Sequence, residues 1–287
     1  PARNRRIQGA SRRALRRMIE RLAEFLERHP NLFVLTGAGL STASGIADYR
    51  DDHGEWKQRQ PVELRDFLKS EHARRRYWSR SMIGWPPFAK AAPNDGHFAL
   101  AHLARAGRIA TTVTQNVDGL HERAGHAGVV ELHGRLADVR CLDCDARFPR
   151  ATVQSWLETT NPTFASRSGR RLADGDVELG DAALDDFAVP ACPSCGGVLK
   201  PDVVFFGESV PRRVVETATG GLNRASAILI VGSSVMVYSS FRFCRAAQAH
   251  RKPMVAINRG VTRADDLLEF KVAADCAATL HALALRF

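Results

Sequence analysis

Four of the six cysteines form two pairs with the pattern C-x-x-C, namely Cys141 with Cys144 and Cys192 with Cys195. Two intervening residues let both sulfur atoms of a pair face one ion, and four thiolates complete a tetrahedral shell. The pattern therefore predicts one structural Zn²⁺ with no open coordination position for catalysis. The alternatives are unrelated free cysteines or a redox disulfide, but paired C-x-x-C motifs without a signal peptide favour a metal.

A glycine-rich turn, TGAGLSTASGIADYR over residues 36–50, follows the apolar run 32–35. A glycine turn after a strand is typical of a dinucleotide site, because glycine lets the backbone approach the pyrophosphate. The spacing departs from G-x-G-x-x-G: Thr42 stands where the third glycine is expected, and the next glycine is Gly45. We therefore expect the segment after Gly39 to form a mobile flap rather than run straight into a tightly packed helix.

Polar side chains follow two other apolar runs. His133 comes directly after 129–132, where it would lie at the rim of a ligand crevice and act as a general base, or else be a structural histidine. Gln115, Asn116 and Asp118 follow the other run, 109–114. Their amides and carboxylate would hold a ribose, a carboxamide or a water, or else serve ordinary turn chemistry.

These residues need a scaffold that brings strand ends together. Short apolar runs alternate with helical patterns, which predicts an open parallel α/β sheet that binds ligands at the carboxyl ends of its strands. The predicted strands are 32–35, 109–114, 129–132, 227–231 and 254–257, and the predicted helices include 11–29, 97–106 and 240–250.

The alternation breaks in two places. Residues 51–95 are polar, aromatic and proline-rich, and they predict a module of helices and loops that packs over the site. Residues 136–200 hold both cysteine pairs and predict an inserted zinc-binding module. The fold class is thus α/β: a Rossmann-like parallel sheet domain from 1–50, 96–135 and 201–287, with a small zinc-binding insertion and a helical module.

The chain of 287 residues is 45% hydrophobic and 25% charged, as is usual for a globular protein. No apolar run approaches the roughly 20 residues that span a bilayer, and no segment resembles a secretory signal. The formal charge is +10, but a basic helix face carries no base readout, so we expect no specific nucleic-acid partner. Much of the excess lies early in the chain, at Arg3, Arg5, Arg6, Arg12, Arg13, Arg16, Arg17 and Arg21.

Taken in order, the motifs of the chain resemble the sirtuins, which are NAD-dependent protein lysine deacylases. Finer features, RRRYWSRSMIGW at 74–85 and GSSVMVYSSFRF at 232–243, resemble the class II subgroup, in particular the mitochondrial sirtuin-four type and its bacterial relatives. Ala47 stands where the family usually has proline, which removes no chemical group. The motifs are TGAGLS at 36–41, SGIADYR at 44–50, TQNVD at 114–118, HG at 133–134, both cysteine pairs, KPDVVFFGE at 200–208, GSS at 232–234 and IN at 257–258.

The resemblance implies an NAD site. Gly37, Ala38 and Gly39 would admit the pyrophosphate to the backbone, with a helix N-terminus adding a favourable dipole. Asn116 and Asp118 would hold the nicotinamide ribose and carboxamide. Asp48 and Arg50 would brace the flap while Tyr49 shields the reacting ribose carbon from water. The remaining implied contacts are Ser41, Thr42, Gln115, Gly232, Ser233, Ser234, Asn258, Arg259, Gly260 and Cys276.

The resemblance also implies the reaction. The acyl-lysine oxygen would attack C1′ of the ribose as nicotinamide leaves, and burial of the nicotinamide would favour this attack over hydrolysis. His133, with Asn116 and Asp118 as the other catalytic residues, would then take a proton from the ribose hydroxyls, and the products are free lysine, nicotinamide and O-acyl-ADP-ribose. The substrate peptide would add as a strand along 203–206. Its implied contacts are Tyr77, Arg80, Val204, Phe205, Phe206, Gly207, Glu208 and Val235.

Tyr77 and Arg80 have the spacing Y-x-x-R, which places them on one face of a helix. A hydroxyl and a guanidinium at that spacing can bind a carboxylate, and in the sirtuins such a pair marks removal of succinyl or glutaryl-type groups. We therefore expect a longer or acidic acyl group rather than acetyl. The alternative is a surface arginine beside a core tyrosine.

Other functions remain open from the sequence. The same NAD site would serve mono-ADP-ribosyl transfer to protein. A non-enzymatic module that binds NAD or O-acyl-ADP-ribose is disfavoured because His133, Asn116 and Asp118 are all present. A nucleic-acid-binding zinc protein ranks last. The expected partners are acyl-lysine proteins or peptides and NAD, with no membrane, in a monomer located in the cytoplasm, or in the mitochondrial matrix of a eukaryote.

Overall fold

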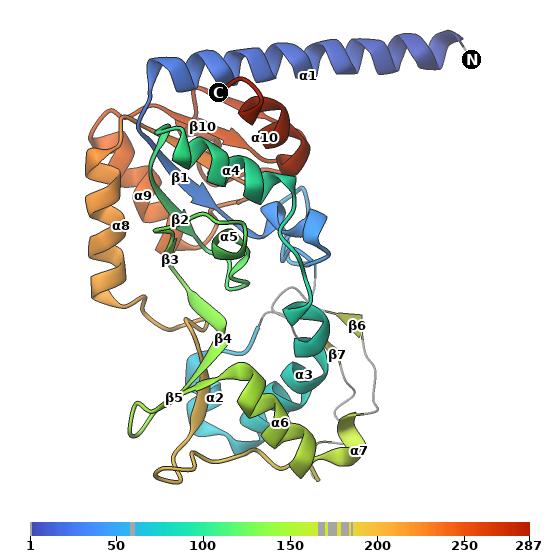
Figure 1. The fold of residues 1–287 in the computed structure, drawn as a ribbon, viewed down its shortest axis with the longest axis vertical. Coiled ribbons are helices and arrows are strands. Elements are labelled where there is room, and N and C mark those ends of the chain that lie inside the picture. The colour runs from blue at the N-terminus through green and yellow to red at the C-terminus, as the bar shows by residue number, and fades with distance from the viewer. Residues whose placement is uncertain (1, 58–60, 166–169, 172–176, 179–183, 185) are drawn as a thin grey trace.

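The computed structural model describes residues 2–57, 61–165, 170–171, 177–178, 184 and 186–287. For residues 2–12, the backbone alone is described, so the side chains of Arg3, Arg5, Arg6 and Arg12 lie outside the described part. Two lobes make up the molecule, with the six-stranded sheet in one and the three-stranded sheet in the other (Figure 1). No helix in the described part is both long and apolar enough to cross a membrane.

The larger lobe is built on a parallel sheet of six strands in the order β11-β10-β9-β1-β2-β3. The chain builds the sheet outward from β1, first to one side and then to the other, so the strand order reverses between β1 and β9. This is the doubly wound arrangement, in which ligands bind at the point of reversal. The strands are β1 (Leu32–Thr36), β2 (Ile109–Thr114), β3 (Val130–Glu131), β9 (Ala227–Val231), β10 (Met254–Ile257) and β11 (Phe270–Val272).

Helices cover both faces of this sheet, and its central strands are accordingly buried at every position and almost entirely apolar. Successive side chains of a strand point to opposite faces, so Leu32 and Val34 join one core while Phe33 and Leu35 join the other. The first face carries α1 (Ala2–Arg28), α4 (Asp95–Arg105) and α10 (Cys276–Ala284), and the second carries α8 (Arg212–Arg224) and α9 (Tyr238–Ala249). In Figure 1, α1 runs across the end of this lobe beside α10.

The smaller lobe contains an antiparallel sheet in the order β5-β4-β8. The helical module and the zinc-binding module share one core there: Phe67 and Trp78 pack with Val139 and Leu157. Its elements are α2 (Leu64–Lys69), α3 (Glu71–Ala89), β4 (Gly134–Cys141), β5 (Arg147–Pro149), α6 (Arg150–Thr160), α7 (Pro162–Ala165), β6 (Arg170–Arg171), β7 (Val177–Glu178) and β8 (Leu199–Val203).

The glycine turn leads into two short 3₁₀ turns, η1 (Ala38–Leu40) and η2 (Thr42–Ser44). The expectation that no tightly packed helix follows Gly39 is therefore confirmed. The expected dipole of a helix N-terminus at this turn is wrong, because three-residue turns align too few peptide groups. Gly45 ends the second turn with φ of 81°, a left-handed conformation that favours glycine.

Candidate functional site

The carboxyl ends of β1, β2 and β9 open onto a cavity of about 1350 Å³ that is also walled by the smaller lobe. Every residue predicted to contact the dinucleotide lines this cavity. So do His133, Tyr77 and the segment 204–208. Of the predicted site residues outside the cysteine cluster, Arg80 and Val235 alone are absent from its described wall.

The glycine turn packs directly against the turn after β9. The Gly39 N–H donates to the Gly232 carbonyl at 2.8 Å, and the Gly37 N–H donates to the Val231 carbonyl at 3.0 Å. A Cβ on Gly39 would lie 2.9 Å from Gly232 Cα, which is closer than real Cβ atoms approach. These glycines therefore fit two backbone turns together as well as leaving room for a ligand.

The segment after the glycine turn is held by its own side chains. Asp48 forms an ion pair with Lys57 at 2.6 Å, and the Arg50 guanidinium lies 4.1 Å from the centre of the Trp56 ring. Tyr49 meets the same ring edge-on, with centroids 6.2 Å apart. The prediction that Asp48 and Arg50 brace this loop is confirmed, whereas the shielding role of Tyr49 stays a prediction.

Asn116 and Asp118 are positioned by residues of the glycine turn. The Asn116 side-chain amide donates to the Gly37 carbonyl at 3.2 Å and to the Ser41 hydroxyl at 3.0 Å. That hydroxyl donates to the Asp118 carboxylate at 2.7 Å, and the Leu120 N–H donates to it at 2.9 Å. Burial raises the pKa of Asp118, and these two donors oppose the rise. The turn after β1 and the turn after β2 thus form one hydrogen-bonded unit.

His133 lies on the same wall, between two hydrogen-bond partners. Its Nδ1 is 3.1 Å from the Gln115 carbonyl oxygen, and its Nε2 is 2.9 Å from the hydroxyl of Ser239. Burial lowers the pKa of His133 to about 4, and the Gln115 carbonyl opposes the shift. The imidazole is therefore neutral at physiological pH, as a proton acceptor must be. Ser239 was missed in the sequence, since only the fold brings the start of α9 to the end of β3.

Val235 was predicted to contact substrate, and this is wrong. Its side chain is 1% exposed and packs in the core under the sheet. Its φ of 45° is rare for a β-branched residue, and its N–H donates to the Ser233 hydroxyl at 3.1 Å. This twist turns Val235 away from the cavity, which is lined by the next three residues, Met236, Val237 and Tyr238.

The segment predicted to receive a peptide strand is partly occupied by the protein itself. The Leu64 N–H donates to the Phe206 carbonyl at 2.9 Å, and the Phe205 N–H donates to the Glu208 carboxylate at 2.9 Å. The buried Lys200 ammonium forms an ion pair with Glu208 at 2.9 Å. This segment is a braced wall, and addition of a peptide strand to its remaining backbone groups stays a prediction.

Tyr77 and Arg80 lie on α3, as predicted, but they have different surroundings. Tyr77 is buried, packs against Phe67 and Phe205, and lines the cavity. Arg80 is half-buried and is not part of the described cavity wall. The described wall therefore does not bring the two side chains together as a carboxylate clamp.

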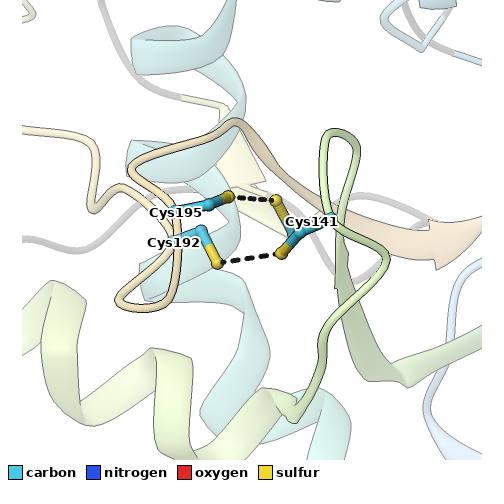
Figure 2. Close-up of side chains that lie close together, drawn as sticks. Cys141, Cys192 and Cys195 are labelled. Atoms are coloured by element: carbon cyan, nitrogen blue, oxygen red, sulfur yellow. Dashed lines mark hydrogen bonds between the residues drawn. The ribbon is translucent and has the colours of Figure 1, made fainter.

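The four cysteines of the C-x-x-C pairs converge in the smaller lobe, with all four sulfur atoms within 4.8 Å of one another. Figure 2 shows the two loops facing each other, with Cys192 and Cys195 turned toward the loop of Cys141. Cys141 Sγ is 3.5 Å from Cys195 Sγ, and Cys144 Sγ is 3.8 Å from Cys192 Sγ. Backbone N–H groups point at two of the sulfurs, as in metal knuckles. The cluster is consistent with one structural zinc, and none of its members lines the cavity.

Comparisons with known proteins agree with this geometry. A sequence profile of the Sir2 family matches residues 37–239. "NAD-dependent protein deacetylase 2" of Bradyrhizobium diazoefficiens is 55% identical over 259 residues, covering 90% of this chain and 95% of the relative. "NAD-dependent protein deacylase Sirt4" of Drosophila melanogaster is 43% identical, covering 90% of this chain and 84% of the relative.

Solved structures give the same answer. "Sir2 bound to acetylated peptide" superposes with a TM-score of 0.75 at 28% identity, covering 93% of this chain and 98% of that one. A Sir2 chain bound to a propionylated peptide superposes with a TM-score of 0.74 at 28% identity and the same coverage. The predicted resemblance is therefore confirmed, and the chain belongs to the Sir2 family, the sirtuins.

Proposed function

We propose that this protein is an NAD-dependent protein lysine deacylase that transfers the acyl group of an acyl-lysine to ADP-ribose and releases nicotinamide. The main observation that supports this proposal is that His133, Asn116, Asp118 and the glycine turn come from separate strand ends and line one cavity. The bacterial relatives named as deacetylases and the solved Sir2 chain with an acetylated peptide support this proposal.

The residues present fit NAD. The cavity lies at the reversal of strand order, and its wall offers glycine backbone, the Ser233 and Ser234 hydroxyls and the Gln115 and Asn116 amides. When bound, NAD supplies the electrophilic ribose carbon that accepts the acyl oxygen. The residues at this end of the cavity are buried or half-buried, so bound NAD and acyl-lysine together would exclude water that would otherwise hydrolyse the dinucleotide.

In this proposal, His133 is the general base. The Gln115 carbonyl can only accept a hydrogen bond, so the neutral imidazole carries its proton on Nδ1 and keeps a lone pair on Nε2. A ribose hydroxyl that reaches Nε2 can give up its proton there. Asn116 and Asp118 hold the reacting end of the dinucleotide, and their fixed hydrogen bonds to the glycine turn limit reorganisation during the reaction.

For the acyl group, we propose a chain longer than acetyl. Tyr77 and Phe205 give the cavity an apolar aromatic wall, while Arg80 lies outside the described wall. An aliphatic chain gains free energy against such a wall, whereas an acidic group would need Arg80 to turn inward. A peptide panel with acetyl, medium-chain and glutaryl groups tests this, and faster release of acetyl or of glutaryl than of the medium-chain group would overturn it.

The function itself is tested by NAD-dependent nicotinamide release with acyl peptides. The variant His133→Ala should lose at least about a hundredfold in rate, as expected when a general base is removed. The matched control is His102→Ala, an exposed histidine on α4 that does not line the cavity. Mass spectrometry of the products separates deacylation, which yields O-acyl-ADP-ribose, from protein mono-ADP-ribosylation. Retained deacylation in His133→Ala would refute the assignment.

A further inference from the structure

We propose that Ser239 is a positioning residue for the base: its hydroxyl holds neutral His133 with the Nε2 lone pair facing the cavity. The inference rests on the proposed function for the role of His133. It begins from a single contact, the 2.9 Å separation between Ser239 Oγ and His133 Nε2.

The direction of that hydrogen bond follows from the other side of the ring. Nδ1 faces the Gln115 carbonyl oxygen at 3.1 Å, and a carbonyl has no proton to give. Nδ1 must therefore be the protonated nitrogen of the neutral ring, and Nε2 must be the acceptor. The Ser239 hydroxyl is then the donor, so it recognises one tautomer of His133.

The fold holds the Ser239 hydroxyl in place. Ser239 is the second residue of α9, and both Ser239 and His133 line the cavity. The chain entering α9 is set by the left-handed Val235 and by the Arg263 guanidinium, which donates to the Met236 carbonyl at 3.1 Å. Partners on both edges of the imidazole define the plane of the ring. With Ser239 removed, the Gln115 contact is the one hydrogen bond from the described residues that still holds the ring.

The hydroxyl also affects the protonation of the base. Donation to the Nε2 lone pair favours the neutral ring, so it acts in the same direction as burial and keeps the pKa of His133 low. When a ribose hydroxyl arrives, it takes over the acceptor that Ser239 occupied. The partner exchange leaves the number of hydrogen bonds on Nε2 unchanged.

The pH readout has to allow for neighbouring charges. The ionisable groups that share the cavity wall with His133 come from several elements, and they stay the same in each variant compared below. They are Asp48, Tyr49, Arg50, Asp51, Asp52 and Lys57 after the glycine turn, Tyr77 on α3, Asp118 after β2, Glu208 after β8, Arg212 on α8, Tyr238 and Arg242 on α9, and Arg259, Asp275 and Cys276 near β10 and α10.

The test is a histidine NMR titration of the full chain without substrates, combined with rate–pH profiles. In the wild type, nitrogen shifts should show the tautomer protonated at Nδ1. In Ser239→Ala, the pKa of His133 should rise by about half to one unit, and the acid limb of kcat/KM should move by the same amount. The value of kcat should fall several-fold, with KM for NAD little changed, and Ser239→Thr should restore the low pKa.

The matched control is Ser240→Ala, which removes a hydroxyl from the same helical turn without touching His133. It should leave the pKa of His133 unchanged. A wild-type ring protonated at Nε2, an unshifted titration in Ser239→Ala, or an equal shift in Ser240→Ala would overturn the proposal. The titration needs no turnover, so it remains decisive if His133→Ala shows that the proposed function is wrong.

Discussion

A buried cluster of three histidines makes acid stability a quantitative test of the fold. His97, His121 and His126 are 0%, 3% and 4% exposed, and consecutive ring centres are 5.1 Å and 5.5 Å apart. Burial lowers the pKa of His97 and of His126 to about 4 and holds that of His121 well below its ordinary value. The cluster lies behind the site, where His121 Nε2 is 3.0 Å from the Thr36 hydroxyl.

The sign and size of the effect follow from His126. Its pKa is 6.5 in the unfolded chain and about 4 in the fold, so the unfolded state binds the extra proton between those values. Stability is fully present above pH 6.5 and falls as the pH drops toward 4. From pH 7 to pH 5, the loss from this one group is about 2 kcal/mol, because one pKa unit corresponds to about 1.36 kcal/mol.

The variant His126→Gln removes this proton site while leaving an amide beside Thr112, whose hydroxyl lies 3.2 Å from His126 Nε2. The free energy of unfolding, measured in urea at pH 7, 6 and 5, should fall less steeply in the variant than in the wild type. The free energy of unfolding of the wild type minus that of the variant should therefore fall by about 2 kcal/mol from pH 7 to pH 5.

The control is His102→Gln, an exposed residue, which should keep the wild-type slope. Zinc loss at acid pH affects all three proteins alike, because the cysteines belong to the smaller lobe, away from the substituted histidines. A gap between wild type and His126→Gln that stays constant to within about 0.5 kcal/mol would refute the reasoning.

Other predictions concern the turns, the metal and the substrate wall. Gly39→Ala places a Cβ against Gly232 and should lower NAD affinity, measured by calorimetry, roughly tenfold or more. Gly45→Ala has nothing within 4 Å of its Cβ and should cost only about 1 kcal/mol of stability. Equal losses of NAD affinity in the two variants would contradict the packing argument. Metal analysis should find one zinc per chain, and Cys195→Ser should lower the melting temperature and expose the smaller lobe to protease; full zinc content in that variant would exclude the site. Lys200→Met removes one of two cationic partners of Glu208, since Arg140 stays 3.6 Å from that carboxylate, and it should cost about 1–3 kcal/mol of stability. Part of that loss should be restored in Lys200→Met/Glu208→Gln, and no recovery in the double variant would count against the pair. Arg80→Ala should not change the acyl preference, and a selective loss of glutaryl removal would show that Arg80 does reach the substrate.

The central sheet was predictable because its strands are unmistakable in the sequence. The strands at 227–231 and 254–257 match their predicted bounds, since both are continuous apolar runs that end at a polar or glycine turn. The short edge strands gave weaker signals. The predicted strand 129–132 contains only Val130–Glu131, and β11 was missed because its three residues include Lys271. Edge strands have one partner and need fewer apolar residues.

Contacts within the site were less predictable than the identities of its members. A sequence motif can show that Val235 belongs to a loop at the site, but it does not reveal a positive φ that turns the side chain inward. Helical spacing places Tyr77 and Arg80 on one face, yet it does not say how much of that face the cavity reaches. The shared core of the smaller lobe depends on which distant segments pack together, and periodicity carries no information on that choice.

The glycine turn shows why a family motif and its physical cause need separate arguments. The absence of an early third glycine correctly predicted that no α-helix starts there, so the anion-binding power of the turn has to come from backbone and side-chain donors rather than a dipole. Gly232 has φ of 58°, and a Cβ on it would lie 2.3 Å from the Leu40 N atom. Neither Gly39 nor Gly232 has room for a Cβ while the two turns are packed together. A substitution in the turn after β9 should disturb the turn after β1 as directly as a substitution in that turn itself, because the two turns meet where the strand order reverses.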